Sequence, residues 1–331
     1  MIINLPSSKD FDNLANSCLT QAFNIVFETD KHVYDNFDKD LQDDVWTYSQ
    51  EKLNTAVVLL HQGIEAFMKA SVSLVTPLLL IEGKRSDWPV LPKQRDKEFN
   101  DFYTTPSEAL LYTFYATTKK DVDEALISHI EEIRKVRNQI VHGISRTRLN
   151  PKFLVDKILD TYLFFKGKDA WWEAVSGFHF NHPLTGYYDL SIETAQFAER
   201  LDYALNMVGK SKMAKHFAIN LRGRSYFCPK CLQDYVRGVG EDYKYAWAFL
   251  TPNSASSTSV TCLNCGNENK VIRQPCPYDG CKGNVLYRIE DLSKFNDASV
   301  ALTDEAPEAM EDEHGFCLTC QENIWWKVQE I

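Results

Sequence analysis

The chain has 331 residues, of which 44% are hydrophobic and 25% are charged, so it is long enough for two or three compact domains and is not disordered throughout. Its net charge of −10 excludes a uniformly basic surface. No stretch reaches the roughly 20 apolar residues that a membrane span requires. The first residues also lack the basic start and apolar run of a signal peptide. These features predict a cytoplasmic protein that does not engage membranes.

The charges are distributed unevenly along the chain. Residues 133–152 and residues 203–233 each carry six Arg or Lys and no acid, whereas residues 297–314 carry seven acids and no Arg or Lys. Two basic segments in an acidic chain favour a focused anion site over a generally adhesive surface. Ordinary scatter of surface charge is the alternative.

Hydrophobic periodicity predicts that the chain before residue 226 is mainly helical. Residues 1–44 have a helical, acidic pattern but carry no motif. Amphipathic helices bounded by Gly, Pro or capping residues are expected at about 45–75, 105–116, 121–142, 150–166 and 191–208. The aromatic stretch 171–183 is expected to connect two of these helices. After residue 226, short Tyr-rich and Val-rich segments between Ser/Asn-rich turns predict small β-sheets.

The cysteines are grouped in a way that indicates metal binding. Cys18 stands alone, and the other eight form four close pairs between residues 228 and 320. In a chain without a secretory signal, such pairs indicate metal ligands rather than disulfides. The predicted ligands are Cys228, Cys231, Cys262, Cys265, Cys276, Cys281, Cys317 and Cys320.

The spacing of these cysteines predicts two structural zinc ions. Two thiolates on one tight turn can bind one ion, and two such turns complete a tetrahedral site. Pairing neighbours in order assigns the first four cysteines to one site and the last four to another, with a crossed arrangement as the alternative. His314 is either a substitute ligand in the second site or a surface residue. Four thiolates leave no open position for water, so neither ion is expected to be catalytic.

Between the first and second cysteine pairs, aromatic residues recur at every second position over part of the chain. Tyr235, Tyr243, Tyr245, Trp247 and Phe249 could stack on bases of a nucleic acid. Alternation at every second residue has a simpler explanation, which is that one face of a strand packs on a core. We favour the packing interpretation.

The expected helix 121–142 carries a possible catalytic motif near its end. Arg137, Asn138 and His142 lie in the segment KVRNQIVHG. Asn138 and His142 are one helical turn apart, whereas Arg137 falls on the apolar stripe between Ile133 and Val141. An arginine on such a stripe needs an anionic partner. That partner is either Glu65 in a structural ion pair or a phosphate bound in a cleft.

The segment RNQIVH followed by glycine resembles the Arg-x4-6-His signature of the HEPN superfamily, including the polar residue directly after the arginine. The helix AVVLLHQGIEAFMKA, with Glu65 and Lys69 one turn apart, is also similar to the first helix of that family. The resemblance covers roughly residues 45–208. It implies a helical bundle of four or five helices that dimerises so that two motifs face one another.

The resemblance also implies an activity. Ribonucleases of this family cleave RNA without metal, using the 2′-hydroxyl as nucleophile and leaving a cyclic phosphate. Carried over to this chain, His142 is the general base or acid and Arg137 holds the scissile phosphate. Asn138 orients the phosphate or the histidine. Glu65 and Lys69 support them. The basic residues expected to line the entry for RNA are Arg134, Lys135, Arg146 and Arg148.

Together these features predict a mainly α fold, a HEPN-like helical bundle followed by a small β-rich zinc-ribbon region. The expected parts are a helical extension (1–44), the HEPN-like domain (45–210), a basic connector (211–225) and tandem zinc ribbons (226–331). The function expected is an endoribonuclease that is toxin-like or defence-related and that a regulatory protein or trigger controls. The alternative is a non-catalytic module for dimerisation or nucleotide binding, whose ribbons bind nucleic acid or a protein.

Some HEPN toxins carry a tyrosine two residues after the histidine for silencing by AMP transfer. Ile144 occupies that position here.

Overall fold

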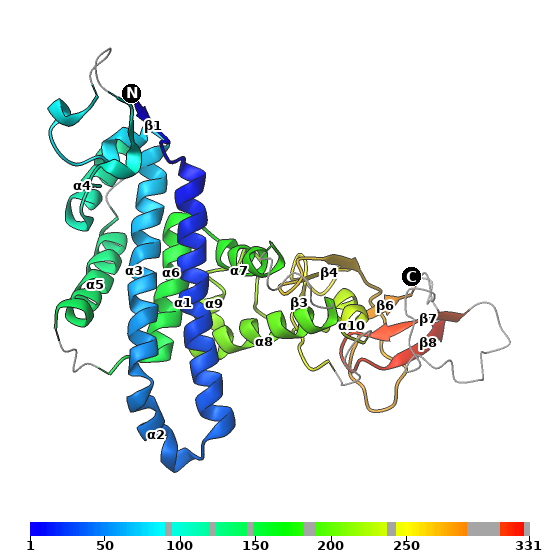
Figure 1. Cartoon of the computed structure of the whole chain (residues 1–331). Helices are drawn as coiled ribbons and strands as arrows, with labels where there is room; N and C mark the ends of the chain where they lie inside the picture. Colours follow the sequence, from blue (N-terminus) through cyan, green and yellow to red (C-terminus); the bar gives the residue numbers. More distant parts are fainter. Residues whose placement is uncertain are drawn as a thin grey trace. The chain divides into compact units, whose positions relative to one another are not determined.

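Figure 1 shows the computed structural model, which describes residues 1–89, 95–118, 123–143, 148–181, 190–236, 243–289 and 312–327. The chain divides into two compact units, Met1–Phe180 (the first unit) and Asn181–Ile331 (the second unit). Over the described ranges the first unit is mainly helical, and the second combines helices with two small antiparallel sheets. The predicted mainly α class with a β-containing, cysteine-rich C-terminal part is therefore confirmed.

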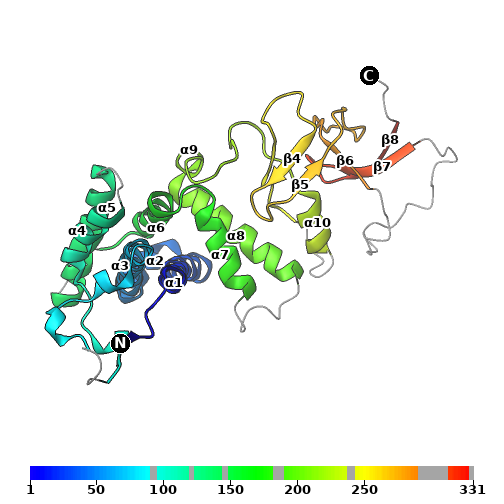
Figure 2. The same ribbon diagram turned by 90° about the horizontal axis from the view of Figure 1, so that it is seen from above.

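Two long helices, α1 (Ser8–Asn36) and α3 (Gln50–Ser73), lie side by side and run in opposite directions in the first unit. The shorter α2 (Lys39–Tyr48) joins them. Figure 2, a view turned by 90°, shows the pair packed together nearly end-on. A Cβ atom added to Gly63 of α3 would lie 2.7 Å from Cγ of Leu19 of α1, so the glycine permits the close approach of the two helices.

The other helices of the first unit pack around this pair. α4 (Ser107–Thr118) and α5 (Glu124–His142) contact α3, and α6 (Pro151–Phe165) contacts both α1 and α3. In α7 (Ala170–Asn181), the Trp171 ring meets Phe23 of α1 edge-on at 5.4 Å. The remaining short elements of this unit are β1 (Ile2–Ile3), β2 (Lys97–Glu98), η1 (Pro77–Leu80), η2 (Arg85–Asp87) and η3 (Phe99–Asp101).

The described residues of the second unit form two three-stranded antiparallel sheets, ordered β3-β4-β5 and β6-β7-β8. Its helices are α8 (Leu190–Val208), α9 (Lys210–Met213) and α10 (Pro229–Val236). Its strands are β3 (Ala248–Leu250), β4 (Ser259–Cys262), β5 (Glu268–Lys270), β6 (Leu286–Arg288), β7 (Asp312–Cys317) and β8 (Asn323–Lys327). The register pairs Ala248 with Cys262 and Leu286 with Cys317, which places a cysteine at the end of a strand in each sheet.

Backbone hydrogen bonds link the segments next to the two sheets. Ile272 and Leu286 form an isolated antiparallel bridge. The N–H of Phe227, next to Cys228, donates to the carbonyl of Leu318, next to the end of β7, at 2.9 Å. The sheet regions are therefore linked by the main chain as well as by sequence.

Several helices differ from the sequence expectation. The pattern from residue 45 to 75 is split at Ser49 into the end of α2 and all of α3. The stretch 171–183, expected to be a connector, is largely the helix α7 because its tryptophans are buried. Residues 1–44, expected as an extension, contribute α1 to the core of the first unit. In the described part of the chain, the helices are all too short or too polar to cross a membrane.

The close approach of α1 and α3 leads to a prediction about stability. We expect Gly63→Val to lower the free energy of unfolding by about 1–3 kcal/mol, because the new side chain overlaps Leu19 in a packed core. The measurement is urea unfolding of the full chain, followed by far-ultraviolet circular dichroism. Lys52→Val, at an exposed position of the same helix, is the control for valine in α3. Equal stability of the two variants would contradict this account of the packing.

Candidate functional site

The first half of α5 is anchored and its last turn is not. The Asp123 side chain caps the helix by accepting hydrogen bonds from the backbone N–H groups of Ala125 (2.9 Å) and Leu126 (3.3 Å). The buried side chains of α5 are Leu126, His129, Ile130 and Ile133. Beyond Ile133 the predicted apolar stripe leaves the core, because Val141 is 47% exposed. Arg137 is accordingly half-buried rather than enclosed.

Arg137 has no acidic partner in the described part of the chain. Its Nη1 donates a hydrogen bond to Oδ1 of the neighbouring Asn138 at 3.0 Å. The ion pair with Glu65 that was one of the two predicted alternatives is not formed. Arg137 instead lines a pocket of about 220 Å³ together with Glu65, Lys69 and other residues of α3. The structure therefore leaves its positive charge free to bind an anion.

His61 is a residue of this pocket that sequence reasoning missed. Its Nδ1 lies 3.9 Å from Glu65 Oε1, and its Nε2 lies 3.4 Å from the Ser107 hydroxyl. Burial lowers the pKa of His61; Glu65 opposes this shift, and the nearby positive charges of Arg137 and Arg134 add to it. These effects favour the neutral form of the imidazole. Its spacing of four residues from Glu65 on a helix was the available signal.

His142 and Asn138 line a different hollow, with a volume of about 1060 Å³. Both side chains are exposed, and Lys135 lines the same hollow. Along a helix Asn138 and His142 are separated by about 40°, whereas Arg137 and His142 are separated by about 140°. A single chain therefore presents the arginine and the histidine on different faces of α5. Asn138 connects the two faces, since it binds Arg137 and lines the hollow of His142.

The predicted RNA-entry residues differ in their surroundings. Arg134 is paired with Glu108 at 2.7 Å and with Glu131 at 2.6 Å, so most of its charge is already compensated. Arg148 is paired with Asp43 at 3.1 Å. Lys135 is exposed and lines the hollow of His142. Arg146 lies outside the described residues.

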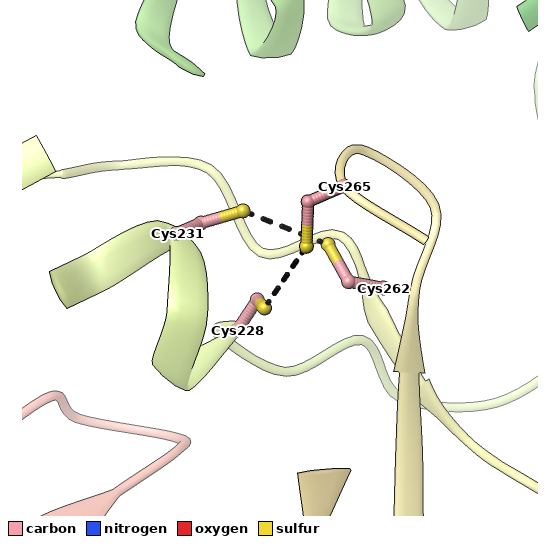
Figure 3. A group of neighbouring side chains, drawn as sticks. All are labelled: Cys228, Cys231, Cys262 and Cys265. Carbon is pink, nitrogen blue, oxygen red and sulfur yellow. Dashed lines mark hydrogen bonds between the residues drawn. The ribbon is translucent and has the colours of Figure 1, made fainter. Parts of the chain in front are cut away.

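The first group of cysteines is shown in Figure 3. Cys228 and Cys231 come from the start of α10, and Cys262 and Cys265 from the end of β4 and the turn after it. Their four Sγ atoms lie within 4.8 Å of one another, with 3.7 Å between Cys228 and Cys265 and 3.8 Å between Cys231 and Cys262. Four sulfurs bound about 2.3 Å from one ion at tetrahedral angles lie about 3.8 Å apart. These two separations match that geometry, so the group could hold a metal ion.

Asparagine side chains donate hydrogen bonds to the sulfurs of this first group. The Nδ2 atoms of Asn264, Asn267 and Asn269 lie 3.7 Å from Cys231 Sγ, 3.3 Å from Cys265 Sγ and 3.9 Å from Cys228 Sγ, respectively. An N–H donor stabilises a thiolate more than a thiol. These contacts favour the deprotonated cysteines that bind metals.

The second group has the same arrangement. The Sγ atoms of Cys276 and Cys320 are 4.0 Å apart, those of Cys281 and Cys317 are 3.8 Å apart, and all four lie within 4.8 Å. Pairing of neighbours in order is therefore confirmed, and the crossed arrangement is wrong. His314 belongs to neither alternative that the sequence suggested. It is buried and stacks on Trp325 at 4.3 Å, outside the group of thiols.

Three of the alternating aromatic residues are buried. Tyr243, Trp247 and Phe249 have exposed fractions of 7% or less, and Tyr245 is half-buried. The regular strand begins only at Ala248, so most of this alternating stretch lies outside β3. The side chain of Tyr235 lies outside the described residues.

Comparison with known proteins finds no matching family model, no matching curated protein and no matching solved structure. The indications of function therefore come from the residues themselves. These are the pocket of Arg137, the exposed His142 and the two four-cysteine groups.

The cysteine geometry predicts the result of removing one ligand. We expect Cys231→Ser to reduce bound metal from two ions per chain to one, because three thiolates bind much more weakly than four. Metal content is measured by elemental mass spectrometry on the purified protein. Cys18→Ala, which changes the lone cysteine of α1, should retain both ions. Two ions in Cys231→Ser would show that the first group is not a metal site.

Proposed function

We propose that this chain is a metal-independent endoribonuclease of the HEPN type with two structural zinc ions. The observation that carries the proposal is the environment of Arg137. A half-buried guanidinium without an acidic partner lies in a pocket and is held by Asn138, on the same helix as an exposed histidine. The Arg-x4-His spacing from Arg137 to His142 resembles the signature of that family.

Arg137 is suited to binding the scissile phosphate. Its planar guanidinium matches the oxygens of a phosphate, and the hydrogen bond to Asn138 fixes one of its nitrogens. Lys69 lines the same pocket and adds a second positive charge, and Glu65 and His61 also contribute to its lining. As the phosphate acquires charge in the transition state, the fixed guanidinium stabilises it.

His142 is suited to moving protons. It is exposed at the last residue of α5 and lines an open hollow whose other residues include Glu131, Glu132 and Lys135. In the proposed reaction the 2′-oxygen attacks the adjacent phosphorus, its proton leaves to a base, and the bond to the 5′-oxygen breaks as that oxygen gains a proton. The products are a 2′,3′-cyclic phosphate and a free 5′-hydroxyl. An imidazole can perform either proton transfer near neutral pH.

A homodimer explains how residues on two faces of α5 can serve one phosphate. Pairing the last turns of two α5 helices about a two-fold axis would place His142 of one copy near Arg137 of the other. Val141, 47% exposed between them, is an apolar side chain that such contact would cover. The proposed partners are therefore RNA and a second copy of the chain.

Zinc is the metal that best suits the two cysteine groups. It prefers tetrahedral coordination by thiolates at about 2.3 Å, and the sulfur separations of 3.7–4.0 Å match that geometry. Four thiolates fill the coordination shell, so the ions would stabilise the second unit rather than activate water.

A non-catalytic RNA-binding or dimerisation module is the second candidate. Two observations favour it: Arg137 and His142 line different hollows, and Arg134 and Arg148 are already paired with carboxylates. RNA binding by this module would occur without new RNA ends.

The two candidates predict different results with purified RNA. We expect the wild-type protein to cut RNA to products with cyclic phosphate ends, and Arg137→Ala and His142→Ala each to lower the rate at least 100-fold, in line with the loss of a general acid-base or charge-stabilising group. Cleavage is measured by gel electrophoresis and sequencing of the new ends. Brief treatment with EDTA should leave the rate unchanged.

Matched controls separate catalysis from folding. His32→Ala changes another exposed helical histidine, and Arg85→Ala changes another exposed arginine of the same unit; both should cut RNA at the wild-type rate. Helix content and bound metal should be equal in all variants. Cleavage that persists in His142→Ala would disprove the ribonuclease proposal, as would wild-type protein that binds RNA without cutting it.

A further inference from the structure

The second unit contains a pocket that the proposed ribonuclease reaction does not use. Its volume is about 240 Å³. Its lining includes the half-buried Tyr245 and the buried Trp247 and Phe249. Rings that line a concave site provide flat apolar surfaces for a flat ligand.

Two lysines stand at the rim of this pocket. Nζ of Lys244 lies 5.5 Å from the ring centre of Tyr245, and Nζ of Lys210 lies 5.7 Å from that of Phe249. Both lysines are exposed. Lys210 donates a hydrogen bond to the backbone carbonyl of Gly223 at 3.2 Å. Burial raises the pKa of Asp202, which lines the same pocket, and the positive charge of Lys244 opposes that shift. The positive charges of the two lysines are thus placed where aromatic surface meets solvent, a suitable position for a phosphate.

An acidic group completes the lining. Asp202 of α8 is half-buried and accepts a hydrogen bond from Asn206 at 3.0 Å through Oδ2. Its other oxygen can accept a hydrogen bond from a ligand. Exocyclic amines of adenine, cytosine and guanine are such donors, whereas uracil has no amine.

We propose that this pocket binds a nucleotide, with the base against the half-buried ring of Tyr245, an exocyclic amine toward Asp202 and the phosphate at Lys210 and Lys244. The volume supports this division, because 240 Å³ is the space of about eight waters at roughly 30 Å³ each. That space suits one base, and leaves the ribose and phosphate at the rim. The nucleotide is either a free mononucleotide or one unpaired nucleotide of an RNA strand.

The test measures binding in the His142→Ala background, so that it does not depend on RNA cleavage. The probes are AMP, UMP and a fluorescently labelled eight-nucleotide oligoadenylate, and the method is calorimetry or fluorescence anisotropy. Tyr245→Ala should weaken binding roughly 5- to 150-fold, the range expected for loss of stacking on one base. Tyr245→Phe should retain binding, and UMP should bind more weakly than AMP.

The rim lysines are tested in the same assay. Lys210→Gln combined with Lys244→Gln should weaken binding about tenfold or more and reduce its dependence on salt, because fewer counterions are released. Lys215→Gln, at an exposed position of the same unit, is the matched control. Metal content and helix signal verify that each variant is folded.

The outcomes distinguish the two sources of the nucleotide. Equal dependence of AMP and the oligoadenylate on Tyr245 would indicate a site for free mononucleotides, whereas dependence of the oligoadenylate alone would indicate a site for an RNA strand. The proposal is wrong if neither probe binds, or if Tyr245→Ala and the double lysine variant bind as tightly as the parent protein. If the wild-type protein proves not to cleave RNA, these binding results keep their meaning, because they do not depend on cleavage.

Discussion

The packing of α1 against α3 is the constraint on which the first unit depends. Leu19 of α1 occupies the space that a side chain at position 63 would fill, so the two helices approach closely only because Gly63 has no Cβ. α4, α5 and α6 then pack on α3, and α6 also contacts α1. The packing of α1 on α3 therefore fixes the positions of His61, Glu65 and Lys69 relative to α5. α1 itself carries none of the candidate catalytic residues.

Only the first half of α5 is anchored in the core, and this determines how far Arg137 and His142 are buried. Ile130 and Ile133 hold the helix in the core, whereas the turns that carry Arg137 and His142 extend beyond it. A fully buried arginine would have required an acidic partner to offset the cost of desolvation. Half-burial lowers that cost, so Arg137 can be held by the uncharged Asn138 and keep its positive charge for a ligand.

The sequence predicted most accurately the features that depend on the spacing of nearby residues. Each close cysteine pair lies on a single turn, so both four-cysteine groups could be identified, and so could the ends of α5 and α6, where Gly143 and Asn150 act as caps. What depends on contacts between distant segments could not be predicted. The role of residues 1–44 as core, the burial of His61 and the placement of Arg137 and His142 on separate hollows all follow from tertiary packing.

The backbone links between the two small sheets have a consequence for metal uptake. Phe227, next to Cys228, forms a backbone hydrogen bond with Leu318, next to Cys317. When the cysteine turn of one group is ordered, it therefore restrains the backbone of a cysteine turn in the other group. The ion that arrives second would meet a partly organised site and lose less conformational freedom on binding. Thermodynamic reciprocity then requires each ion to raise the affinity for the other. If both four-cysteine groups bind ions, they would load as a cooperative pair, passing from empty to full over a narrow range of metal concentration.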